Sequence, residues 1–175
     1  MEIFSSIPKG MKRIIRSFSL IINYWMKHHT LFKHIHNYNN EVLRANMWIL
    51  LPVIFFPFST SFLYEVLEVN DSNMDLLILP FRVFILNNIL ASVATYYFYW
   101  VVMKKNRAFA FSWDTIEEKL FSEQLIVFAI CFTAVLLLSF ITMEYCSLGL
   151  LPIIAFRFRR RTLLKSQKLR TTNAK

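Results

Sequence analysis

The run LIVFAICFTAVLLLSFITMEYCSLGLLPIIAF, residues 125–156, decides the fold class of this chain. Its thirty-two positions contain a single charged residue, Glu144. A helix of about 20 apolar residues crosses the roughly 30 Å hydrocarbon core of a bilayer, so this run is long enough to span with tilt. The sequence therefore predicts a membrane protein.

Two further apolar runs precede it. Residues 47–64 contain no charge, and Pro52 and Pro57 within them are compatible with a transmembrane helix, because neighbouring helices satisfy the backbone groups that proline frees. Residues 76–103 end in an aromatic cluster immediately before Lys104 and Lys105, as in the aromatic belt at a membrane interface. Both runs predict transmembrane helices.

A fourth span is expected near the N-terminus, although residues 17–26 alone give only about 15 Å of helix. Extended back through Ile14, this segment reaches across if Lys12, Arg13 and Arg16 snorkel to one surface; an interfacial helix is the alternative. We therefore expect an all-α fold, a polytopic membrane helical bundle with about four transmembrane helices. The expected helices are residues 11–36, 44–67, 76–104 and 115–158, within one domain (1–160) followed by a basic cytoplasmic tail (161–175).

Composition excludes several classes. The chain is 56% hydrophobic with only 2 Gly in 175 residues, which excludes disordered and glycine-rich phosphate-binding architectures. No P-loop, H-E-x-x-H or G-x-S-x-G motif is present, so we predict neither an enzyme nor a cofactor. Cys131 and Cys146 are fifteen residues apart, about 22 Å along a helix, and are interpreted as small apolar residues.

The charge is unevenly distributed. Lys and Arg total 20 against 11 Asp and Glu, a net charge of +9, and eight of the basic residues follow Phe156. The excess of Lys and Arg at both ends of the chain predicts that both termini face the cytoplasm, which agrees with four spans in a cell membrane. The tail follows a span directly, so its expected partners are membrane lipids and not nucleic acid.

Polar residues inside the apolar runs are candidates for an ion pathway. Asn87, Asn88, Ser92 and Thr95 form a polar stripe, which predicts either interhelical hydrogen bonds or the lining of a pore. Glu144 stands about 20 Å from Arg157 along a helix, and an acidic side chain at such depth suggests a transport role. Arg82 is nearer the surface, and snorkelling explains it.

Four histidines, His28, His29, His34 and His36, lie within nine positions. No pair has the i,i+4 spacing of a helical metal site, and the nearest acidic residue is Glu41, so we predict no metal site. The segment is interpreted as an interfacial helix end, with a pH response as the alternative.

The same region resembles a known family. Ser17-Phe18, then Trp25-x-x-His28-His29-x-x-Phe32 and Asn46, precede a Leu-Pro-Phe pattern that ends in Pro57-Phe58-Ser59-Thr60. These residues resemble the third and fourth helices of the transmembrane protein 175 potassium channels of bacteria and endolysosomes. The later apolar runs are similar to that family's fifth and sixth helices, so the resemblance covers about residues 11–160, with the specific motif residues (Trp25, His28, His29, Phe32 and Pro57) confined to 17–62.

The resemblance implies a six-helix subunit, tetrameric in bacteria, that conducts potassium through a pore lined mainly by its first helix. That helix carries Arg-x-x-x-Phe-Ser-Asp, which does not precede Ser17 here. Arg107, Phe111 and Ser112 imitate the motif, but Trp113 occupies the aspartate position. No pore-lining residue is therefore carried over.

Three hypotheses follow. The first is passive potassium conduction by a homo-oligomer, with this chain a truncated or accessory subunit. The second is a noncatalytic membrane interaction or assembly protein with a lipid-binding basic tail. The third is an ion-coupled transporter that uses Glu144.

Overall fold

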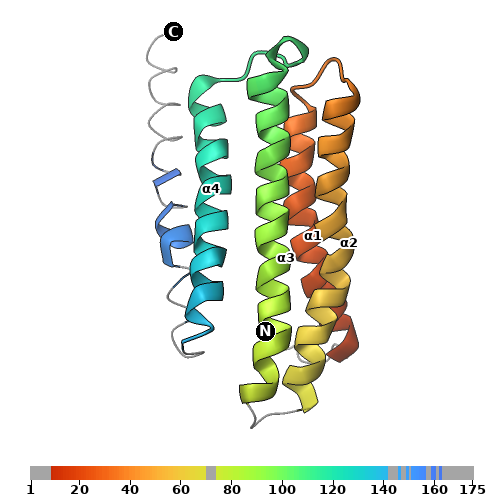
Figure 1. Cartoon of the computed structure of the whole chain (residues 1–175), viewed down its shortest axis with the longest axis vertical. Helices are drawn as coiled ribbons and strands as arrows, with labels where there is room; N and C mark the ends of the chain where they lie inside the picture. The colour runs from red at the N-terminus through yellow and green to blue at the C-terminus, as the bar shows by residue number, and fades with distance from the viewer. Residues whose placement is uncertain are drawn as a thin grey trace.

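A computed structural model describes residues 9–69, 74–141, 146, 149, 151–156, 159, 160 and 162. Four long helices run side by side in it (Figure 1): α1 (Lys9–Phe32), α2 (Asn40–Val69), α3 (Met74–Trp100) and α4 (Thr115–Leu138). A π-helical turn, η1 (Val101–Lys105), extends α3, and a 3-10 turn, η2 (Arg107–Phe109), follows. The expected all-α membrane bundle is confirmed.

Local sequence explains where two helices begin. The Asn39 side chain accepts hydrogen bonds from the backbone N–H groups of Glu41 and Val42, at 3.1 and 3.0 Å, and so caps α2. Asp114 caps α4 by accepting from the N–H of Ile116 at 2.9 Å. Each cap satisfies backbone donors that have no partner in the first turn of a helix.

Three helical segments of the described chain are long and apolar enough to cross a membrane: Asn40–Leu67, Asp75–Lys105 and Thr115–Leu138. α1 is not one of the three, although its 24 residues extend about 36 Å. A span by α1 therefore stays a prediction from sequence. Many large apolar side chains on the helices are exposed, as expected of surfaces that face lipid.

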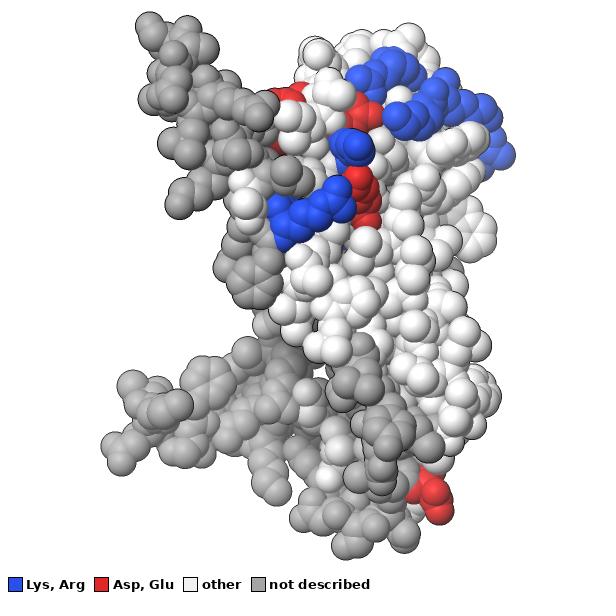
Figure 2. All heavy atoms as spheres, turned by 90° about the vertical axis from the view of Figure 1, so that its left-hand side faces the viewer, with Lys and Arg blue, Asp and Glu red and all other residues white. Residues whose placement is uncertain are grey.

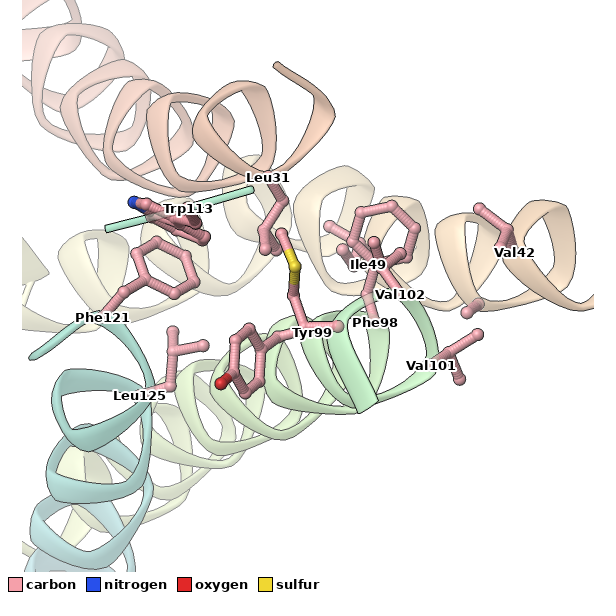
Figure 3. Close-up of a cluster of buried hydrophobic side chains, with 12 residues drawn as sticks. Leu31, Val42, Ile49, Phe98, Tyr99, Val101, Val102, Trp113, Phe121 and Leu125 are labelled. Carbon is pink, nitrogen blue, oxygen red and sulfur yellow. The ribbon is translucent and has the colours of Figure 1, made fainter. Parts of the chain in front are cut away.

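α3 is central to the bundle, packing against both α2 and α4, while α1 packs mainly on α2. The largest buried cluster lies at the end where residues 33–39 and 101–114 connect the helices (Figure 3). There Leu31 of α1, Phe98 and Tyr99 of α3, and Phe121 of α4 converge with Trp113 from the connection before α4. Within the described residues the backbones of α1 and α4 do not approach each other closely, and side chains such as Lys27 and Phe128 make the contact between the two helices.

The last apolar run is not the single helix that we expected over residues 115–158. α4 ends at Leu138, Ser139 to Ile141 form a turn, and residues 151–156 are a separate helical segment. That segment returns along α4, because Gly149 approaches Val135 and Arg160 approaches Gln124. A side chain at Gly149 would meet the Val135 side chain at 2.6 Å, so glycine permits the close approach.

Length explains the difference. A continuous helix of the 32 residues at 125–156 would extend about 48 Å, well beyond the roughly 30 Å of hydrocarbon. A chain that turns back buries a second apolar segment against the first. Hydropathy does not reveal the turn, because neither charge nor proline interrupts the sequence between Leu125 and Ile141.

Candidate functional site

The polar stripe predicted on α3 lies inside the bundle. Asn87 is 6% exposed, and its Nδ2 donates to the carbonyl oxygen of Pro52 at 3.2 Å and to Oγ of Ser59 at 3.3 Å. Both partners are on α2, where proline interrupts the regular hydrogen bonding of the helix. Asn87 therefore links α3 to a proline-containing part of α2.

The other three members of the stripe are more deeply buried. The Tyr24 hydroxyl of α1 donates to the backbone carbonyl of Asn88 at 3.3 Å and lies 3.2 Å from Oγ of Ser92. Thr95 donates to the carbonyl one turn earlier on its own helix at 2.7 Å. The structure thus places Asn87, Asn88 and Ser92 in a hydrogen-bonded seam between α1, α2 and α3, while the bond of the buried Thr95 stays within α3. Tyr24 is the contributor that the sequence analysis missed.

Glu144, the fifth candidate for an ion pathway, lies outside the described residues. A role for it in transport stays a prediction from sequence.

The motif histidine of α1 joins two helices. His28 Nε2 lies 2.6 Å from Oδ1 of Asn46 on α2, with the ring nitrogen as donor because an amide oxygen only accepts. The imidazole also packs against the rings of Trp25, Phe32 and Phe98, with centroid distances of 5.5, 4.5 and 5.8 Å. The motif therefore fixes α1 against α2 and the end of α3.

The remaining motif residues lie on the surface. His29 is exposed, although it directly follows the partly buried His28 on α1. Pro57 is exposed on α2, and its carbonyl accepts from the Thr60 hydroxyl at 3.1 Å. Thr60 also donates to the carbonyl of Phe56 at 2.6 Å, which supplies polar partners around the proline.

The other two histidines stack on aromatic side chains of the 101–114 connection. His34 lies 4.1 Å from the ring of Trp113, and His36 lies 4.8 Å from that of Phe111. Their backbones pair as well, since Ile35 and Ala110 form an isolated antiparallel bridge. Across the described part of the chain, no group of three His, Cys, Asp or Glu residues could hold a metal ion.

An ion-pair network at the same end was not anticipated. Glu118 is 8% exposed and accepts from Arg107 at 3.0 Å, from the Tyr99 hydroxyl at 3.1 Å and from Lys104 at 3.4 Å. These groups come from α3, the π-helical turn, the 3-10 turn and α4. The i,i+14 and i,i+11 separations carry no local sequence signal, so only the fold reveals the network.

Taken together, the geometry is that of a multi-pass helical membrane protein whose interior polar groups hold its helices together. A family model described as the endosomal/lysosomal potassium channel TMEM175 matches residues 2–57. No curated protein and no solved structure matches the chain. The N-terminal segment of the chain, residues 2–57, is thus similar to the TMEM175 potassium channel family, in agreement with the resemblance, and it includes all five motif residues.

Proposed function

We propose that this chain contributes to passive potassium conduction as part of an oligomer. The single observation that supports the proposal most directly is the family match over residues 2–57, which contain α1 and the Asn46 and Pro57 positions of α2. Members of an ion channel family carry ions without a catalytic step. We therefore propose potassium as the transported ion and a homo-oligomer, tetrameric by resemblance, as the conducting form.

The oligomer is part of the proposal because of how the interior of one subunit is filled. Asn88, Ser92 and Thr95 are 2%, 0% and 0% exposed, and they are hydrogen-bonded within the protein. An ion that passed between α1 and α3 would have to replace these bonds. A pore between subunits would leave these interior hydrogen bonds intact, and so would a pore completed by a helix from a partner protein. In the second arrangement this chain would be an accessory subunit.

Flux measurement in liposomes tests the proposal. The full 175-residue chain is reconstituted, its helicity is checked, and potassium and sodium efflux are compared with those of empty liposomes. Potassium-preferring flux supports conduction by this chain. Absence of flux from a folded, reconstituted sample contradicts self-sufficient conduction and leaves the accessory role, which coexpression with a longer family member then tests.

The alternative function is a noncatalytic membrane interaction or assembly protein with a lipid-binding basic tail. Its support is the eight basic residues after Phe156, with no acidic residue among them. The alternative predicts a salt-dependent preference for anionic lipid that disappears when Lys165, Lys168 and Arg170 are neutralised. Conduction predicts that the same changes leave the potassium-to-sodium ratio unaltered.

We also propose an orientation in the membrane, with the 33–39 and 101–114 connections facing the cytoplasm. Lys and Arg side chains gather at this end of the described surface (Figure 2), among them Lys33, Lys104, Lys105 and Lys119. Since cytoplasmic loops are enriched in Lys and Arg, this end is the better candidate for the inner face.

This orientation differs from our expectation that both termini are cytoplasmic. That expectation combined the basic residues before Ser17 with those after Phe156. In the fold, however, Arg159 and Arg160 contact Glu123 and Gln124 of α4 and so lie away from the beginning of α1 at Lys9. Cytoplasmic positions for both termini thus stay a prediction from sequence, and the orientation proposed here is the alternative to it.

A further inference from the structure

Two basic side chains, Lys27 and Arg160, line the space between α1 and α4, and each has a buried nitrogen without a hydrogen-bond acceptor. Lys27 of α1 is 8% exposed, and its Nζ has no hydrogen-bond partner in the described protein. The Nε atom of Arg160 is also buried without a partner, although another nitrogen of the same guanidinium donates to Gln124 at 3.0 Å. A buried cation without an acceptor is costly, because it loses its hydration.

Aromatic rings replace part of that hydration. The Lys27 Nζ lies 4.0 Å from the centroid of Phe128 on α4 and 4.9 Å from that of Tyr24. These cation–π contacts hold the ammonium group in the space between the two helices. They do not provide acceptors for its three N–H groups.

Both cations line a cavity of about 560 Å³ between α1 and α4. Its walls are polar toward Asn23 and Gln124 and apolar toward Ile22 and Leu120. A smaller cavity of about 160 Å³ is lined by Arg160, Asn23, Gln124 and Phe128. The two cavities share three of these residues and therefore meet at the guanidinium group.

One acidic residue also lines the larger cavity. Glu117 accepts from the indole Nε1 of Trp113 at 3.4 Å, so its carboxylate is engaged at that wall. The same lining contains two basic residues, Lys27 and Arg160, so its described charged side chains carry one positive charge in excess. A monovalent anion would neutralise the cavity.

The depth of the site matches the headgroup region. Trp25 is 57% exposed two residues before Lys27, and Trp100 and Tyr97 are exposed at the same end of α3. Exposed Trp and Tyr mark the level of the membrane interface. The phosphate group of a lipid lies at this level, with its acyl chains toward the hydrocarbon.

We propose that the cavity between α1 and α4 binds a phosphate-bearing anion through Lys27 Nζ and Arg160 Nε. A phosphate presents several oxygens, which accept from the ammonium and the guanidinium at once and complete the hydrogen bonding of both. The source is either an anionic phospholipid such as phosphatidylglycerol, with its chains along the apolar wall, or inorganic phosphate from solution. The proposal is independent of ion conduction, since it concerns binding alone.

Thermal unfolding of the full chain tests the site with two probes. One series adds inorganic phosphate to protein in a neutral detergent, at constant ionic strength. The other compares nanodiscs of phosphatidylcholine with and without phosphatidylglycerol. We expect the Tm of the wild type to rise by about 3–5 °C with at least one probe, because a ligand that binds only the folded state stabilises it.

Variants assign the effect to the two cations. Lys27→Met and Arg160→Met are each expected to lose the rise in Tm, whereas the controls Lys33→Met and Arg159→Met retain it. Lys33 is exposed near the end of α1, and Arg159 is exposed next to Arg160. Because Lys27→Met removes a buried cation without an acceptor, we expect it to fold and to melt no lower than the wild type in the absence of probe.

The outcomes are decisive in either direction. A rise with phosphatidylglycerol alone identifies the lipid as the source, and a rise with inorganic phosphate in detergent identifies the free anion. The proposal is wrong if neither probe raises the Tm of the wild type, or if Arg160→Met and Lys27→Met keep the full rise. If one of these two variants does not fold, the other still decides.

Discussion

The Arg82 guanidinium of α3 holds Ser139 at the end of α4, donating to its carbonyl oxygen at 2.8 Å and to its hydroxyl at 3.2 Å. It also stacks 3.8 Å from the ring centroid of Phe140. The last carbonyls of a helix have no partner within it, and a cation placed there satisfies them and interacts favourably with the helix dipole. Arg82 thus stabilises the turn at which the last apolar run reverses direction.

Arg82→Gln should therefore loosen this turn. We expect the free energy of unfolding to fall by about 1–3 kcal/mol, since a charged donor is lost from a partly buried helix end. Reversible unfolding in mixed micelles, followed by far-UV circular dichroism, measures the change. Arg44→Gln is the matched control, because the Arg44 side chain is exposed and bonds only to a carbonyl of its own helix, at 3.4 Å. An equal loss in both variants would contradict a specific role for Arg82.

The motif contact between His28 and Asn46 provides a second test. Asn46→Leu removes the acceptor 2.6 Å from His28 Nε2 and leaves a part-buried imidazole N–H without a partner. We expect a loss of about 1–3 kcal/mol in stability, measured by thermal unfolding in detergent. His29→Ala serves as the control, since His29 is exposed one position away, and should change stability by less than about 0.5 kcal/mol.

A substitution of Asn87 distinguishes a structural role of the seam from a role in ion conduction. Asn87→Ala removes a donor shared by Pro52 and Ser59, and we expect a loss of about 1–2 kcal/mol in stability. The potassium-to-sodium flux ratio of the folded variant should equal that of the wild type. Thr133→Ala is the control, because the Thr133 hydroxyl is exposed and bonds only within α4. A changed flux ratio at unchanged stability would instead make the seam part of the ion pathway.

The Glu118 network predicts a larger effect. Glu118→Gln removes the carboxylate between Arg107 and Lys104 and leaves two cations close together without their shared partner. We expect a loss of about 2–4 kcal/mol, reported by thermal unfolding and by faster hydrogen exchange in the 101–114 connection. Glu65→Gln, at an exposed position on α2, should be nearly neutral. Equal stability of the two variants would show that the network contributes little.

Hydropathy and motif residues predicted the helical membrane class and the similarity of residues 2–57 to the TMEM175 family model, because both depend on patterns local in sequence. The reversal after Leu138 was missed, since the residues that fix it, Arg82 and Ser139, are 57 positions apart. Nor did the sequence indicate that Lys27 and Arg160 line one cavity, because the two residues are far apart along the chain. The long-range polar contacts of this fold are thus its least predictable part.

Orientation can be decided by labelling of single cysteines. Asn37 is exposed in the connection between α1 and α2, and Glu65 is exposed near the far end of α2. If the basic end faces the cytoplasm, a membrane-impermeant thiol reagent added to intact cells should label Glu65→Cys and not Asn37→Cys. Cys131 and Cys146 are buried and should add little background. Labelling of Asn37→Cys alone would contradict this orientation and support cytoplasmic positions for the segments before Ser17. Permeabilised cells, in which both positions should react, confirm that an unlabelled cysteine was protected by the membrane and not by the fold.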